Sequence, residues 1–190
     1  MSKIKTDAVR IMFFVLALIC TGCAENYFPK PYGYFRVDLP EHRYKRLETS
    51  FPCAFEIATM AKPEIPQQTG INIVYPALNA TIYCNYQSMR TSNIQELAED
   101  ARKAVYKHLI KADDIKEVVY ENNEKKVYGT FYDLKGNVAS VAQFVLTDSS
   151  EHFFRGAVYF NNVPNKDSIA PMADYIKKDV RHLMESFNWK

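Results

Sequence analysis

The residue with the clearest chemistry is Cys23, which follows an apolar run and a small residue. Residues 11–19 (IMFFVLALI) are apolar throughout, basic residues precede them, and Gly22 comes directly before the cysteine. This is the three-part layout of an export signal, and the run is too short to span a bilayer stably. The pattern predicts removal of residues 1–22 and acylation of the Cys23 thiol, with palmitate as a typical chain. Acyl chains anchor a protein because each buried CH₂ contributes about 0.8 kcal/mol. The alternative is a plain secretory signal with a chance cysteine, since Cys20 stands where lipoprotein signals usually carry Leu.

Two further cysteines, Cys53 and Cys84, remain after the predicted cleavage. An exported protein can form a disulfide, and each cysteine falls on the apolar side of an alternating stretch. If the two strands are neighbours, Cys53 and Cys84 can form a bridge. The alternative is a pair of buried thiols that act as small hydrophobic side chains.

Aromatic and arginine side chains gather in an extended segment after the anchor, residues 24–48, where several prolines rule out a long helix. Rigid aromatic rings with Arg are the composition of interface hot spots. The same composition is typical of a surface that binds glycan or phosphate groups. A further alternative is a segment whose aromatic rings pack on the domain while its charges stay in water. The residues that we predict to contact a partner are Tyr32, Tyr34, Phe35, Arg36, Arg43 and Tyr44.

No catalytic or metal-binding pattern is visible in the sequence. The four histidines, at positions 42, 108, 152 and 182, lack the spacing of a metal motif, and the known nucleophile and nucleotide-binding motifs are absent. Acidic clusters at residues 113–114 and 148–151 fall in predicted turns, where Asp is common. We therefore expect no enzyme activity, no metal and no cofactor. Without residues 1–22 the acidic and basic residues are equal in number, which gives no reason to expect nucleic acid.

The elements that position these residues can be predicted from periodicity. Alternating apolar residues predict strands, and these lie at 34–38, 51–57, 71–75, 80–86, 115–121, 126–132, 138–146 and 152–160. Apolar residues at helical spacing predict helices at 93–109 and 169–187. We expect Ser92 to cap the first helix and Asp167 or Ser168 to cap the second. Residues 59–69 carry two prolines and are expected to form a loop.

This order predicts an α+β domain in which an antiparallel sheet of about six to seven strands is packed by two main helices. The predicted organisation has three parts. These are a signal peptide at residues 1–22, a lipidated cysteine and extended arm at 23–48, and a single domain at 49–190.

Four segments resemble the gliding-motility lipoprotein D (GldD) family of Bacteroidetes. They are YFPKPYGYFRVDLPEHRY at 27–44, NATIY at 79–83, DARKAVYKHLIKADDI at 100–115 and FVLTDSSEHFFRGAVYF at 144–160. The resemblance implies a component of the gliding machinery, which is linked to type IX secretion, and it implies no catalytic residue. The order of elements is also similar to the Mog1/PsbP-like fold, which by itself says nothing about function.

We therefore expect a non-enzymatic lipoprotein that is anchored in the cell envelope by Cys23 and contacts other gliding or secretion proteins of the envelope. The residues after the cysteine, Ala24-Glu25-Asn26, are not the acidic run that is associated with surface export, so we expect the protein to face the periplasm. They do not distinguish the inner from the outer membrane. The alternative function is a periplasmic ligand-binding or chaperone-like lipoprotein with a pocket between sheet and helices.

Overall fold

The computed structural model describes residues 38–67, 70–89 and 93–190, and within this part of the chain the fold is α+β with antiparallel strands. The predicted fold class is confirmed. The strands are β1 Tyr44–Glu48, β2 Cys53–Ala58, β3 Lys62–Gln67, β4 Gly70–Tyr75, β5 Ala80–Ser88, β6 Ala112–Asn122, β7 Val127–Gly136, β8 Ser140–Thr147, β9 His152–Phe160 and β10 Asn188–Trp189. The helices are α2 Ile94–Tyr106 and α3 Lys166–Ser186, with short 3-10 turns at η1 Pro76–Leu78 and η3 Lys107–Ile110.

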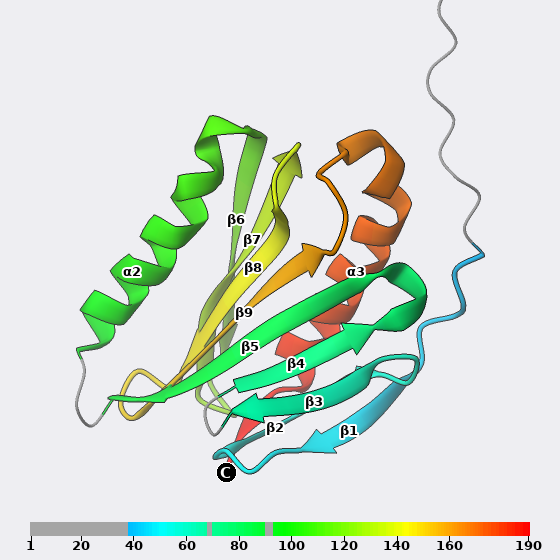
Figure 1. Cartoon of the computed structure of the whole chain (residues 1–190). Coiled ribbons are helices and arrows are strands. Elements are labelled where there is room, and N and C mark those ends of the chain that lie inside the picture. The colour runs from blue at the N-terminus through cyan, green and yellow to red at the C-terminus, as the bar shows by residue number, and fades with distance from the viewer. Residues whose placement is uncertain (1–37, 68–69, 90–92) are drawn as a thin grey trace, which may run out of the picture. The chain divides into compact units, whose positions relative to one another are not determined.

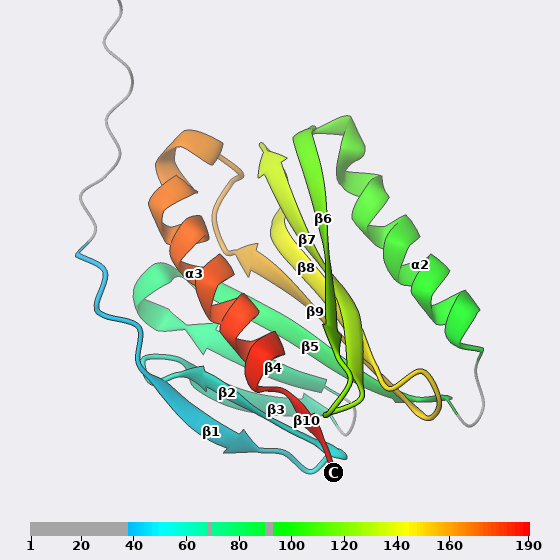
Figure 2. The ribbon, with the colours of Figure 1, turned by 180° about the vertical axis from the view of Figure 1, so that it is seen from behind.

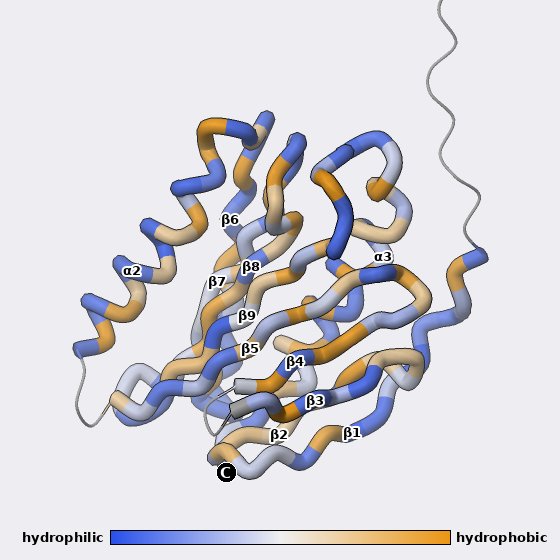
Figure 3. The backbone as a smooth tube through the Cα atoms, viewed as in Figure 1, coloured by the Kyte–Doolittle hydropathy of each residue, from blue (hydrophilic) through white to orange (hydrophobic). Residues whose placement is uncertain are grey.

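The strands of the described residues form two sheets. The larger has seven strands in the order β3-β4-β5-β9-β8-β7-β6, and the smaller has three in the order β1-β2-β10. Neighbours pair antiparallel throughout. Successive side chains of a strand point to opposite faces, and Figure 3 shows the corresponding alternation of apolar and polar residues along the strands.

Helices α2 and α3 lie on opposite faces of the seven-stranded sheet (Figures 1 and 2). Helix α3 packs against β2 as well as β7 and β8, so the main core fills the space between the two sheets and this helix. Stacked and tilted rings of Phe55, Phe154 and Phe187 join β2, β9 and the end of α3 in this core. Helix α2 buries only a narrow stripe, with Ala101 and Val105 against the sheet.

Some predicted boundaries are wrong. Residues 62–67, which we expected to be a loop, form β3 at the edge of the seven-stranded sheet, where a proline without an N–H group is tolerated. The cap of α2 is Asn93, whose side chain accepts a hydrogen bond from Gln95 N, and Ser92 lies outside the described residues. Helix α3 begins earlier than predicted because Asn165 caps it by accepting from Ser168 N. Of the strand expected at 34–38, only residue 38 is described, and it is not in a strand.

One buried ion pair ties α3 to the sheet. Lys177 Nζ lies 2.6 Å from Asp133 Oδ1 of β7, and their side chains are only 9% and 14% exposed. The guanidinium of Arg181 adds a second, longer contact of 3.7 Å to Asp133 Oδ2. Lys177 lies outside the apolar stripe of this helix and is nevertheless buried. The carboxylate compensates the buried ammonium, as such burial requires.

Candidate functional site

The described end of the predicted arm is fixed to α3 by one buried carboxylate. Asp179 is 3% exposed. Its Oδ1 atom lies 2.6 Å from His42 Nδ1 and accepts a hydrogen bond of 3.1 Å from the hydroxyl of Tyr44. Its Oδ2 atom accepts a bond of 3.1 Å from the hydroxyl of the buried Tyr75 on β4. A residue of the arm, a strand and a helix therefore meet at a single side chain. We call the set His42, Tyr44, Tyr75, Tyr175, Asp179 and His182 the arm clamp.

Ring stacking completes the arm clamp. The ring of His42 stacks on Tyr175 with centroids 4.1 Å apart, and the ring of Tyr44 stacks on His182 at 3.5 Å. His182 Nε2 in turn lies 2.7 Å from Glu56 Oε2 of β2. Burial, followed by the negative charge of Asp179 and its hydrogen bond, raises the pKa of Tyr44 and of Tyr75. Both phenols therefore remain neutral donors at physiological pH.

The contact of His42 with Asp179 is also the arrangement that orients a histidine base in hydrolases. A carboxylate only accepts hydrogen bonds, so the bond at Nδ1 requires a proton on that nitrogen. Among the described residues, His42 has no hydrogen bond with a serine, threonine or cysteine side chain. This geometry therefore holds the arm in place.

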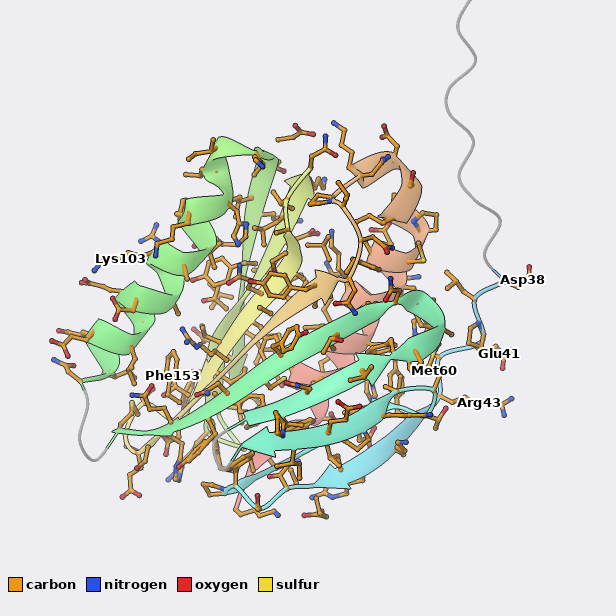
Figure 4. All side chains as sticks on the ribbon, in the orientation of Figure 1. Asp38, Glu41, Arg43, Met60, Lys103 and Phe153 are labelled. Atoms are coloured by element: carbon orange, nitrogen blue, oxygen red, sulfur yellow. The ribbon has the colours of Figure 1, made fainter. Side chains whose placement is uncertain are left out.

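The arm residues on either side of His42 point away from Asp179, toward solvent. Glu41 and Arg43 are 87% and 76% exposed in their side chains and form a loose ion pair of 3.5 Å with each other. Figure 4 shows both directed outward beside Met60. They flank an open groove of about 610 Å³ whose other walls include Thr59, Met60 and Tyr175. The arm thus presents charged, exposed side chains over a groove, while the alternate residues His42 and Tyr44 are held on α3 by their contacts with Asp179.

Of the six residues predicted to contact a partner, the structure describes two. Arg43 is exposed at the groove, whereas Tyr44 is half-buried in the arm clamp. Tyr32, Tyr34, Phe35 and Arg36 lie outside the described residues, and so does Cys23. The described part of the arm also includes β1, a strand paired with β2 that the sequence analysis missed.

Sequence reasoning also missed the helix half of the arm clamp. Asp179 is not one of the apolar residues whose helical spacing predicts α3, yet its carboxylate is buried with three donors around it. A usable pattern was present: Tyr175, Asp179 and His182 are spaced by four and three residues, so they share one face of the helix. An acidic residue between two ring-bearing residues on one face indicates a polar contact rather than a solvated side.

Cys53 and Cys84 face the same core from different sheets. Both are buried free thiols, at 0% and 4% exposure, on β2 and β5. These strands are not neighbours, so the condition that the two cysteines lie on neighbouring strands is not met. Burial raises the pKa of Cys53 to about 11, and it raises the pKa of Cys84 further, with a smaller effect from nearby Cys53. A bridge between them stays a prediction.

The described residues lack the features of two other classes of site. No group of three or more His, Cys, Asp or Glu side chains is arranged to hold a metal ion within this part of the chain. None of the helices described is both long and apolar enough to cross a membrane.

Comparison with known families supplies one match. The family described as gliding motility lipoprotein GldD matches residues 24–189, which is nearly all of the chain after Cys23. No curated protein matches the chain.

Proposed function

The chain belongs to the gliding motility lipoprotein GldD family, and from this premise we propose that it is a non-enzymatic, lipid-anchored component of the gliding machinery that acts through protein–protein contacts. The family makes it a gliding-motility lipoprotein associated with a membrane. Our proposal adds that the arm and the adjoining groove form the contact surface, and that its partners are envelope proteins of gliding and type IX secretion.

The observation that carries the proposal is the alternation of the arm between fixed and exposed residues. His42 is fixed below through Asp179, while Glu41 and Arg43 stay exposed over a groove. A segment held this firmly presents its exposed side chains without ordering on binding, which lowers the entropy lost on association. The same arm continues toward Arg36, Phe35, Tyr34 and Tyr32, which we propose extend the contact surface.

The proposed membrane anchor is Cys23. We propose that residues 1–22 are removed, that Cys23 is acylated with palmitate among its chains, and that residues 23–48 lead from the membrane to a domain at 49–190. In support, the sequence before Cys23 has the layout of an export signal. The lack of an acidic run after Cys23 supports a protein that faces the periplasm.

The experiment compares spreading with protein abundance in single variants. Arg43→Ala should abolish or strongly reduce colony spreading while abundance and melting temperature stay near those of the unchanged protein, because exposed substitutions usually change stability by less than about 0.5 kcal/mol. Tyr34→Ala and Arg36→Ala should act in the same way. Lys103→Ala is the matched control, since Lys103 is an exposed cation on α2, far from the arm in sequence.

Two results would contradict the proposal. One is normal spreading of the Arg43, Tyr34 and Arg36 variants. The other is a uniform fall in spreading, abundance and melting temperature, which would show that the arm residues act only by packing on the domain.

A further inference from the structure

A second hollow lies on the opposite side of the seven-stranded sheet from α3. It has a volume of about 490 Å³ and lies between α2 and the face of β4, β5, β9, β8 and β7. Helix α2 packs on β8 and β9. The strands on the other side of β9, which are β5, β4 and β3, extend the sheet beyond the part that α2 covers (Figure 1). A volume of this size is within the range of small-molecule sites. We call this hollow the α2 cavity.

The strand register explains why the α2 cavity is open. Across the sheet, Asn72 is opposite Tyr83, Tyr83 is opposite Ala157, and Ala157 is opposite Gln143. Ala157 is thus a methyl group in the middle of a row of larger side chains. On the facing helix, the residues that line the cavity include Ala101 and Ala104, which are equally small. Small residues on both walls leave a space that larger side chains would fill.

The next row of the sheet brings a single charge into the α2 cavity. Gly70 is opposite Asn85, and Asn85 is opposite Arg155. Among the described residues that line the cavity, Arg155 is the only charged one, and none of them is a carboxylate. Within the part of the chain that the structure describes, the guanidinium of Arg155 has no ion-pair or hydrogen-bond partner. The described lining of the cavity therefore carries one positive charge without a counter-charge.

Neutral polar groups surround this charge. The amide side chains of Asn72, Asn85 and Gln143 line the cavity, and among the described residues none of them has a side-chain hydrogen-bond partner. The rings of Tyr83 and Tyr159 meet edge to face with centroids 5.8 Å apart at the same wall. Tyr83 is 45% exposed. Three amides and two rings with accessible surface suit a ligand body that has both hydrogen-bonding groups and an apolar face.

We propose that the α2 cavity binds a small organic carboxylate whose body carries neutral hydroxyl or amide groups. Arg155 pairs with the carboxylate, for which its planar fork of donors is well matched, and the amides and Tyr rings hold the body. A phosphate monoester fits less well, because its charge of about −1.5 to −2 exceeds the single positive charge of the site. This inference does not depend on the proposed function, since none of the described arm residues, 38–48, lines the cavity.

The test is a titration of the full chain in detergent, observed by amide NMR. Two matched pairs of probes differ only in the charged group: glucuronic acid with glucose, and N-acetyl-dialanine with its C-terminal amide. The acid of at least one pair should shift the amide resonances of Gly70, Asn85, Gly156 and Ala157, and its neutral counterpart should not. Which pair responds distinguishes a sugar acid from a peptide-like acid.

Variants locate the binding. Arg155→Gln should weaken binding of the active acid by about tenfold to a hundredfold, as expected for the loss of a charged hydrogen-bonding group. Ala157→Leu should abolish binding by filling the cavity, with an NMR spectrum that stays folded elsewhere. Arg46→Gln, which removes an exposed guanidinium outside the cavity, should bind as the unchanged protein does.

Three results would overturn the proposal. These are shifts from neither acid, equal shifts from an acid and its neutral partner, and binding that Arg155→Gln leaves unchanged.

Discussion

Replacing Asp179 with alanine tests the arm clamp directly. The variant removes the acceptor of three hydrogen bonds, and the three donors differ in what they can do next. Tyr75 is only 1% exposed, so its hydroxyl would remain buried without a hydrogen-bond partner, which costs about 1–3 kcal/mol. His42 and Tyr44 are half-buried and can turn to water, so each lost bond is worth about 0.5–1.5 kcal/mol. We expect the free energy of unfolding to fall by about 2–6 kcal/mol in total.

The assay is urea unfolding of the Asp179→Ala chain beside Asp174→Ala, which removes an exposed carboxylate from the same helix. The control should change the free energy of unfolding by less than about 0.5 kcal/mol. Tyr75→Phe keeps the ring and removes one donor, so its loss in free energy of unfolding should lie between the losses of the two Asp variants. A loss below about 1 kcal/mol for Asp179→Ala, or equal losses for both Asp variants, would refute the reasoning, because it would show that the arm is not held through this carboxylate.

Three further predictions concern the core and the anchor. Burial raises the pKa of Cys53 to about 11 and also raises the pKa of Cys84. Because the thiols ionise more readily in the unfolded chain, the free energy of unfolding of the reduced protein should keep its full value below about pH 8.5 and should fall as the pH rises toward 11. Urea unfolding from pH 7 to 10.5 checks this, Cys53→Ala should flatten the decline, and a reduced protein with no decline would contradict it. Gly129→Ala should destabilise the domain by about 1–3 kcal/mol as overpacking, because a Cβ there would lie 2.0 Å from the carbonyl oxygen of Val145; thermal unfolding checks this, and an unchanged melting temperature would count against the β7–β8 register. Cys23→Ala should prevent acylation and leave an unprocessed or mislocalised form, whereas incorporation of labelled palmitate into this variant would show that Cys23 is not the acylated residue.

Much of the fold could be predicted from apolar periodicity. Alternation over β5, β8 and β9 and helical spacing over α3 indicated these elements because each buries one regular face. Strand β3 was missed because Pro63 and Pro66 normally disfavour strands, and only its edge position makes them acceptable. Strand β1 was missed because its sequence, YKRLE, is mostly charged and pairs with only one neighbour.

The candidate sites were predicted only in part, for a physical reason. A carboxylate on a helix is usually solvated, so the burial of Asp179 becomes visible only once the arm and β4 bring their donors to it. The α2 cavity depends on which residues of four strands stand in one row. That register is set by tertiary pairing, and a shift of one residue would move Ala157 and Arg155 to the other face.

Site-specific crosslinking in living cells tests the central claim most directly. A photoreactive amino acid is placed at position 43 on the arm and, in a separate strain, at position 103 on α2. If the arm is the contact surface, position 43 should yield a discrete adduct with an envelope protein whose own deletion also stops spreading, and position 103 should not. Absence of any adduct at position 43 in cells that spread normally, or the same adducts at both positions, would contradict a contact surface on the arm.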